Sequence, residues 1–463
     1  MNFILTKYEI IWVTHTLNCA ISYKSACTFH HWSRVMPEEP DWSHGEHTLC
    51  DLQSFPQDTQ RIVELSFSPD GARVGHILSF SEGECRIGSN GTLQEEDFDN
   101  AWMLRFTADN RLTALVSSLG AWSVRVEDTT WPDEYDFVWS PLFSDSGGII
   151  SAAVQKEGQY GMVRNQVTWS ELFPYATDYT MSPDGSMCCC VVQTESLSEG
   201  DINAFREEVF SVAVNERVWS WNFLNAWTPV PDPRTGRTAA VVRRDYQDYS
   251  VAVDGLAWPE RFANAWEPLI APGGDVFAPV QVGSKWGLAR NGELTWPARY
   301  CQLWHLQTDS LGKRIAAIVS PKFGRFTVCI GESTWKTTYP VLTDLRLGPE
   351  GERAAAVGAS RIDPEQPDTL FSPPSWQLVV DDRPAGGWFD QVFPPVFSPD
   401  GGQVAARIKQ NRGFGYILDG RTYPRDFDMA WDPVFSPDGK RIMLRVRDGD
   451  RLKRIVASPE EFK

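Results

Sequence analysis

A short phrase ending in Ser-Pro-Asp-Gly recurs four times along this chain, and each copy joins two β-rich runs. The four copies span residues 67–71, 181–185, 397–401 and 435–439. Proline presets φ at the first corner of a turn, aspartate hydrogen-bonds its own backbone, and glycine accepts a positive φ. The phrase therefore predicts a tight hairpin turn, which restricts the chain to folds built from many short antiparallel strands.

Degenerate copies of the turn fill the gaps and reveal a period. With the closing glycine (or Asn110) as marker, the turns stand at 71, 110, 147, 185, 236, 274, 312, 351, 401 and 439. Seven of the nine intervals are 37 to 39 residues long, and each interval holds four short β-rich runs. This pattern predicts an all-β fold, a β-propeller of four-stranded antiparallel blades with about 38 residues per repeat and up to ten repeats. One ring of ten blades, two smaller propellers, or one ring with some units outside it all fit the count.

The period also divides the chain into segments. Residues 41–463 are predicted to form the propeller, and residues 1–40 an N-terminal extension. The alternative for residues 1–35 is that the start of the chain is mispredicted and that they are an artefact of this error. The last unit lacks outer strands, and strands near His47–Leu52 and Arg61–Phe67 are expected to complete it and close the ring. The two long intervals place insertions at about 193–208, with one helix predicted from Asp201 to Glu208, and at about 359–375. Insertions on one face of a repeat protein often form its binding face.

Most of the 20 tryptophans occupy repeat positions. One set lies eight or nine residues before the turn marker, in the fourth strand of each unit: Trp102, Trp139, Trp227, Trp266, Trp304 and Trp431. A second set closes the third strand: Trp131, Trp169, Trp219, Trp258, Trp296, Trp335 and Trp388. Packing between blades explains the first set, because large aromatic side chains bury much area between stacked sheets. The second set is the predicted partner-binding surface, since tryptophan is favoured at interface hot spots, with stacking on sugars as the alternative.

Composition and motifs disfavour several functions. A net charge of -18 repels phosphate backbones, so no nucleic acid partner is expected. The chain has no nucleophile elbow, phosphate-binding glycine loop or His-Glu-x-x-His motif, which predicts a non-enzymatic protein without a cofactor. Its nine cysteines form no Cys-x-x-Cys pair, and no apolar run reaches the roughly 18 residues of a membrane span. A cytoplasmic protein with no direct membrane insertion is therefore expected.

Only the region before the repeats has spacing that resembles a metal site. Cys27, His30 and His31 are followed by His44, His47 and Cys50. The segment lacks the Cys-x-x-Cys pair of a zinc knuckle. Cys27, His30 and His31 also fall within residues 1–35, for which a mispredicted start is the alternative. No metal site is predicted.

Three phrases carry a family resemblance. Ser-Pro-Asp-Gly hairpins, Asn-Ala-Trp strands at 100–102, 225–227 and 264–266, and Thr-Trp-Pro closures at 130–132 and 295–297 make the chain from about Asp41 onward similar to the TmcD family. TmcD is the tryptophan-rich cytoplasmic subunit of the Tmc transmembrane redox complex of sulfate-reducing bacteria. The turns also resemble TolB-type propellers, and Lys285-Trp-Gly287 resembles WG-repeat proteins.

The TmcD resemblance implies a specific role. It implies a structural or docking subunit of an electron-transfer complex, without a redox centre of its own. Its partners would be an iron–sulfur subunit and a membrane cytochrome b subunit, bound on the inner face of the cell membrane. A stand-alone propeller that binds a glycan or a peptide is the alternative.

Overall fold

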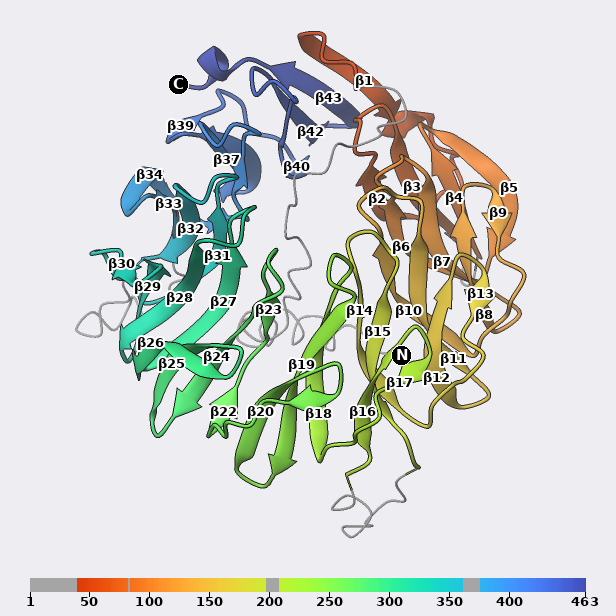
Figure 1. Ribbon diagram of the computed structural model, residues 1–463. Coiled ribbons are helices and arrows are strands. Elements are labelled where there is room, and N and C mark those ends of the chain that lie inside the picture. The colour runs from red at the N-terminus through yellow and green to blue at the C-terminus, as the bar shows by residue number, and fades with distance from the viewer. Residues whose placement is uncertain (1–39, 82–83, 197–207, 361–374) are drawn as a thin grey trace, which may run out of the picture. The chain divides into compact units, whose positions relative to one another are not determined.

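Ten antiparallel sheets follow one another along the chain (Figure 1). The computed structural model describes residues 40–81, 84–196, 208–360 and 375–463. Within these ranges the only helices are the single turns η1 (Leu52–Ser54) and η3 (Pro459–Glu461). The predicted all-β class is confirmed, and the architecture is a ten-bladed β-propeller. The helix predicted from Asp201 lies outside the described residues, apart from Glu208.

The first five blades each contain four consecutive strands. Blade 1 is β2 (Arg61–Phe67), β3 (Val74–Ser81), β4 (Glu84–Ser89) and β5 (Thr92–Phe98); blade 2 is β6 (Asn100–Phe106), β7 (Leu112–Ser118), β8 (Ala121–Val126) and β9 (Thr129–Thr130); blade 3 is β10 (Phe137–Phe143), β11 (Ile150–Lys156), β12 (Gln159–Arg164) and β13 (Val167–Thr168); blade 4 is β14 (Ala176–Met181), β15 (Cys188–Gln193), β16 (Phe210–Val214) and β17 (Arg217–Val218); blade 5 is β18 (Asn225–Asp232), β19 (Arg237–Asp245), β20 (Asp248–Val253) and β21 (Leu256–Ala257).

In three of the remaining blades the first strand is interrupted and forms two short strands that pair with the same neighbour. Blade 6 is β22 (Asn264–Ala265) with β23 (Leu269–Ile270), β24 (Val276–Val282), β25 (Lys285–Arg290) and β26 (Glu293–Tyr300); blade 7 is β27 (Gln302–Thr308), β28 (Ile315–Lys322), β29 (Arg325–Ile330) and β30 (Ser333–Thr334); blade 8 is β31 (Leu342–Leu347), β32 (Ala354–Ala359), β33 (Trp376–Val380) and β34 (Arg383–Phe389); blade 9 is β35 (Gln391–Val392) with β36 (Val396–Phe397), β37 (Val404–Gln410), β38 (Gly413–Leu418) and β39 (Arg421–Thr422); blade 10 is β40 (Met429–Ala430) with β41 (Val434–Phe435), β42 (Ile442–Asp448), β43 (Arg451–Ala457) and β1 (Gly45–Asp51).

The blades are offset by one strand from the units seen in the sequence. The strand before each turn pairs with the strand after it, as β6 does with β7, so each turn lies inside a sheet and not between two sheets. The strand counted as fourth in the sequence unit is therefore the first strand of the next blade. This arrangement follows from turn chemistry, because a tight hairpin turn can only join adjacent antiparallel strands.

The first strands of neighbouring blades are joined by hydrogen bonds at a repeated break in strand pairing. Seven of them contain a register shift, and those of blades 6, 9 and 10 are interrupted at the same place. A bulge leaves backbone N–H groups without a partner in their own sheet. Side chains of the preceding blade accept them: the Glu64 carboxylate bonds the Met103 and Leu104 N–H groups at 3.0 and 2.7 Å, and Asp178 bonds Thr228 N–H at 2.9 Å.

The two ends of the propeller meet in blade 10. β1 pairs antiparallel with β43, so the N-terminal end of the propeller supplies the outer strand of the last blade. The predicted closure by His47–Leu52 is confirmed, whereas Arg61–Phe67 forms the first strand of blade 1 and plays no part in completing blade 10. Blades 10 and 1 then contact through the Phe67 and Trp431 rings, 4.6 Å apart, and through Arg445, which donates to the Ser68 carbonyl at 3.2 Å.

The hydrophobic core is distributed between neighbouring sheets. One cluster joins Leu115 and Val124 of blade 2 to Ile150, Ala152 and Val154 of blade 3, all at most 1% exposed. Equivalent clusters lie between the other blades. Each blade thus buries both of its faces against its neighbours, as repeat proteins do.

Candidate interaction surface

Equal strand order in every sheet gives the blades two distinct ends. At one end lie the hairpins between the second and third strands, here called the hairpin face. At the other end lie the Ser-Pro-Asp-Gly turns and the hairpins between the third and fourth strands, here called the turn face. Both long intervals of the sequence leave from the hairpin face, between β15 and β16 and between β32 and β33.

The tryptophans predicted to bind partners lie at or near the fourth strands, and most are covered. Trp131, Trp169, Trp258 and Trp296 are 5% to 7% exposed. Trp219 and Trp335 are half-buried, and Trp388 in β34 is 46% exposed. Packing between blades accounts for the buried four, because Trp131 belongs to the core between blades 2 and 3 and Trp169 to the next one. Partner binding by this set stays a prediction, and Trp388 is its most accessible member.

An aromatic row runs from blade 2 to blade 4 near the hairpin face, on first and third strands, and the sequence pattern assigned part of it to packing only. Trp102 contacts Trp122 with ring centroids 5.3 Å apart. The row continues from Trp122 to Phe137 at 5.2 Å, from Phe137 to Trp139 at 5.8 Å, and through Tyr160 to Tyr175. Its two ends reach solvent, since Trp102 is 36% and Tyr175 is 43% exposed.

Three hairpin tips on the same face carry apolar side chains. Leu119, between β7 and β8, is 100% exposed, Phe323, between β28 and β29, is 93% exposed, and Tyr246, between β19 and β20, is 53% exposed. Leu119 also has φ of 53°, a left-handed conformation that asparagine or glycine adopts at less cost. Neither the turn conformation nor the core requires leucine there. In the sequence, these exposed positions could have been recognised as apolar or aromatic residues in two-residue turns, where polar residues are usual.

The thiols and imidazoles of the described residues form no metal site. No group of three or more His, Cys, Asp or Glu side chains in the described ranges is arranged to hold a metal ion. Cys27, His30 and His31 lie outside those ranges, while His44 bonds Glu461 at 2.9 Å and Cys50 is buried. The consecutive Cys188, Cys189 and Cys190 are fully buried, and burial raises the pKa of the Cys188 thiol.

Desolvation shifts the pKa of several groups, among them His76 and Asp344. Burial lowers the pKa of His76 to about 4, and both of its ring nitrogens lack a partner in the described part of the chain. Burial also raises the pKa of Asp344, a bulge residue with φ of 52°, above the ordinary carboxyl value. These two groups lie in different blades and do not form a catalytic pair.

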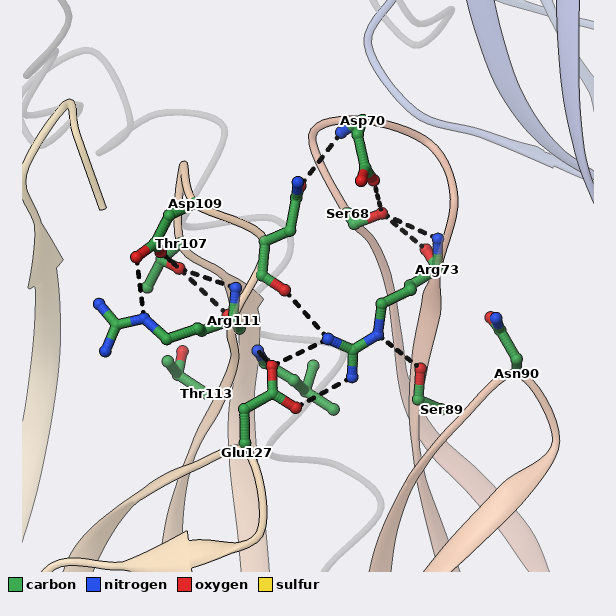
Figure 2. Close-up of polar contacts among 12 residues, drawn as sticks. Ser68, Asp70, Arg73, Ser89, Asn90, Thr107, Asp109, Arg111, Thr113 and Glu127 are labelled. Carbon is green, nitrogen blue, oxygen red and sulfur yellow. Dashed lines mark hydrogen bonds and ion pairs between the residues drawn. The ribbon is translucent and has the colours of Figure 1, made fainter. Parts of the chain in front are cut away.

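Arginines on the turn face link successive blades. In blade 1, Arg73 donates to the Asn110 carbonyl of blade 2 at 3.1 Å and to both carboxylate oxygens of Glu127 at 2.8 and 3.0 Å (Figure 2). Glu127 in turn accepts the Leu112 N–H at 2.8 Å. Planar bidentate pairs of this kind hold both partners in a defined orientation.

A groove of about 650 Å³ lies between blades 5 and 6 on the turn face. Arg237, Asp275 and Asn291 form its polar wall, and Val253, Leu256 and Trp258 its apolar wall. Leu256 is 64% exposed, so its side chain offers apolar surface to a ligand.

No helix in the described ranges is long and apolar enough to cross a membrane.

No protein-family model matches the sequence, and no curated protein matches it either. Among solved structures, one described as a eukaryotic initiation factor matches 74% of this chain over 90% of its own, with 10% identity and a TM-score of 0.45. The β-propeller domain of the Trilobed protease from Pyrococcus furiosus matches 59% of this chain over 96% of its own, with 10% identity and a TM-score of 0.30.

A third structure, the Dos1 propeller, matches 90% of this chain over 95% of its own, with 9% identity and a TM-score of 0.34. Scores this low carry no argument about function, and none of these structures identifies a TmcD protein. The redox-complex partners and the absence of enzymatic activity therefore stay predictions. By the strand order of its own sheets, the chain is a ten-bladed β-propeller.

Proposed function

We propose that this propeller is a non-catalytic docking subunit that binds another protein through its hairpin face. The observation that carries the proposal is the set of hairpin tips with apolar or aromatic side chains, Leu119, Tyr246 and Phe323, which are 53% to 100% exposed at the end of the blades from which both insertions leave. Exposed apolar side chains gain free energy when a partner covers them, and aromatic residues are favoured at such contacts. The net charge of -18 favours a partner with a basic rim.

The partners proposed are the iron–sulfur and membrane cytochrome b subunits of a redox complex, on the cytoplasmic side of the membrane. Support for this finer statement comes from the resemblance to TmcD proteins alone. In this role the chain carries no electrons. It holds its partners in a fixed arrangement, which a rigid propeller with ten mutually packed blades is suited to do.

Affinity purification of the tagged full-length chain from its native membranes tests the proposal. Haem absorbance and iron content of the eluate report the two partners. Leu119→Asn and Phe323→Asn should together lower both signals by about tenfold, because interface hot spots cost at least that much when truncated. Leu119→Asn suits the left-handed turn, so its effect cannot be ascribed to misfolding.

Matched control variants lie on the turn face. Val167 and Leu311 are 68% and 65% exposed, so Val167→Asn and Leu311→Asn remove similar apolar surface from the opposite end of the blades. These variants should leave haem and iron recovery unchanged. Equal recovery of haem and iron from all four variants, or purification of the wild-type chain as a solitary monomer, would contradict the docking proposal.

A ligand-binding propeller, the alternative, requires no partner and is favoured by one observation, the groove between blades 5 and 6.

A further inference from the structure

Five arginines repeat one contact between successive blades. Each follows a turn and donates to the carbonyl of the turn residue in the next blade. The pairs are Arg73 with Asn110, Arg111 with Gly147, Arg237 with Gly274, Arg314 with Gly351, and Arg353 with Gly401, at 2.6 to 3.2 Å. The contact uses part of the guanidinium and leaves its other N–H groups available for a second partner.

At the junction of blades 1 and 2 that second partner is Glu127, which receives two hydrogen bonds from Arg73 (Figure 2). Asn291 holds the same structural position in blade 6. Its side chain accepts the Val276 N–H at 2.8 Å as Glu127 accepts that of Leu112, and both residues have a left-handed φ, of 50° and 53°. The position of Glu127 thus carries no carboxylate at the second junction, where Asp254 of the same blade as Arg237 supplies one instead.

Asn291 cannot replace that carboxylate, because its amide nitrogen donates to Asp275 at 2.7 Å. Among the described residues, the nearest acid to Arg237 is Asp254 of its own blade, at 3.4 Å, and the two side chains are 42% and 50% exposed. Asp275 is already paired with Arg290, whose hydrogen bond lowers the pKa of that carboxyl. Arg237 thus faces the groove with only one long ion pair.

We propose that the groove between blades 5 and 6 binds a glutamate side chain of a partner peptide, which pairs with Arg237 as Glu127 pairs with Arg73. Val253, Leu256 and Trp258 supply an apolar wall for a neighbouring aliphatic residue of the same peptide. Arginine matches a carboxylate bidentately, which gives the site its chemical selectivity. The site lies on the turn face and goes beyond the docking proposal, which concerns the hairpin face.

Ligand-observed NMR on the full chain, with acetyl-Leu-Glu-Leu-amide as probe, tests this site. One ion pair and one packed aliphatic side chain should give a Kd on the order of a millimolar. Replacing glutamate by glutamine in the probe, or Arg237 by alanine, should weaken binding by about tenfold. Arg314→Ala removes the equivalent arginine at the junction of blades 7 and 8 and should leave binding unchanged. Acetate as a second probe separates a site for any free carboxylate from one that needs the aliphatic neighbour.

A second variant keeps the test decisive if Arg237→Ala disturbs the fold. Asn291→Glu supplies a carboxylate from within the chain and gives up the amide hydrogen bond to Asp275, so it should abolish peptide binding without raising the thermal midpoint. Three results would each overturn the proposal. The glutamate and glutamine peptides bind with the same Kd, the glutamate peptide does not bind at a concentration about ten times the expected Kd, or Asn291→Glu binds the peptide as well as the wild type does.

Discussion

His76 shows at the scale of one residue what burial does to a titratable group in this fold. It lies in β3, is 0% exposed, and its ring contacts the Phe55 ring at a centroid distance of 4.7 Å. A glycine, Gly88, stands opposite, where a Cβ would come within 2.2 Å of the imidazole. Neither ring nitrogen has a partner in the described part of the chain, and desolvation lowers its pKa from 6.5 to about 4. The folded protein therefore favours the neutral ring.

Acid should destabilise the protein through His76. The unfolded chain takes up a proton below about pH 6.5, whereas the folded chain resists it until about pH 4. Stability should thus be highest above pH 6.5 and fall by up to about 3 kcal/mol as the pH drops to 4. Urea unfolding of His76→Leu between these values should show a smaller loss than the wild type. The exposed His47→Gln serves as control, and equal pH slopes in wild type and His76→Leu would refute the assignment.

The Ser-Pro-Asp-Gly turn joins the first two strands in four of the ten blades. Its serine is buried and bonds in two directions: Ser436 donates to Asp438 at 2.6 Å and accepts the Arg441 N–H at 3.0 Å. Ser182 and Ser398 make the same pair of contacts in their own turns. The hydroxyl closes the turn by satisfying a backbone donor that the hairpin would otherwise leave buried and unpaired.

Loss of this hydroxyl should weaken the blade. Ser436→Ala leaves the Arg441 N–H without its acceptor, which costs about 1 to 2 kcal/mol. Chemical denaturation should report that loss, while Ser284→Ala, at an exposed hairpin, should lie within about 0.5 kcal/mol of the wild type. An unchanged midpoint for Ser436→Ala would mean that water satisfies the N–H and that the turn depends on proline and glycine alone.

At the scale of the whole molecule, stability depends on the closure of blade 10 by β1. Glu46 of β1 accepts from Lys453 at 2.6 Å and from Arg425 at 2.7 Å, and Cys50 joins Phe67 and Leu452 in the core between blades 10 and 1. Without β1, β43 would become an unpaired edge strand, which invites association between chains. The closure also joins residues that are about four hundred positions apart, as the contact between Glu46 and Lys453 shows.

Removal of β1 should therefore open the molecule. A chain that lacks residues 1–51 should melt about 5 °C or more below the full chain and associate in sedimentation experiments. Its β43 amides should also lose protection in hydrogen exchange. A chain that lacks residues 1–39 alone retains β1 and serves as the control, with an unchanged midpoint. Equal melting of the two truncated chains would show that β1 contributes little to closure.

Local chemistry made the blade predictable from the sequence. Turn residues act over four or five positions, so the four Ser-Pro-Asp-Gly copies and their degenerate relatives mark ten units without knowledge of the fold. The same markers place the β-strands that follow and the sites of both insertions. The groove between blades 5 and 6 was not predictable, because Arg237 and Asn291, which line it, belong to different units and neither residue is unusual in its own segment.

The sequence by itself determined the repeated unit, its length and its β character, because these depend on contacts between near neighbours. Only the tertiary structure decided how the units divide into sheets, that they form ten consecutive blades, and that β1 completes the last one. It also decided that Trp131 is buried while Leu119 and Phe323 stand in solvent. The physical reason is that burial and closure are set by the neighbouring blade, which lies outside the repeat that the sequence pattern describes.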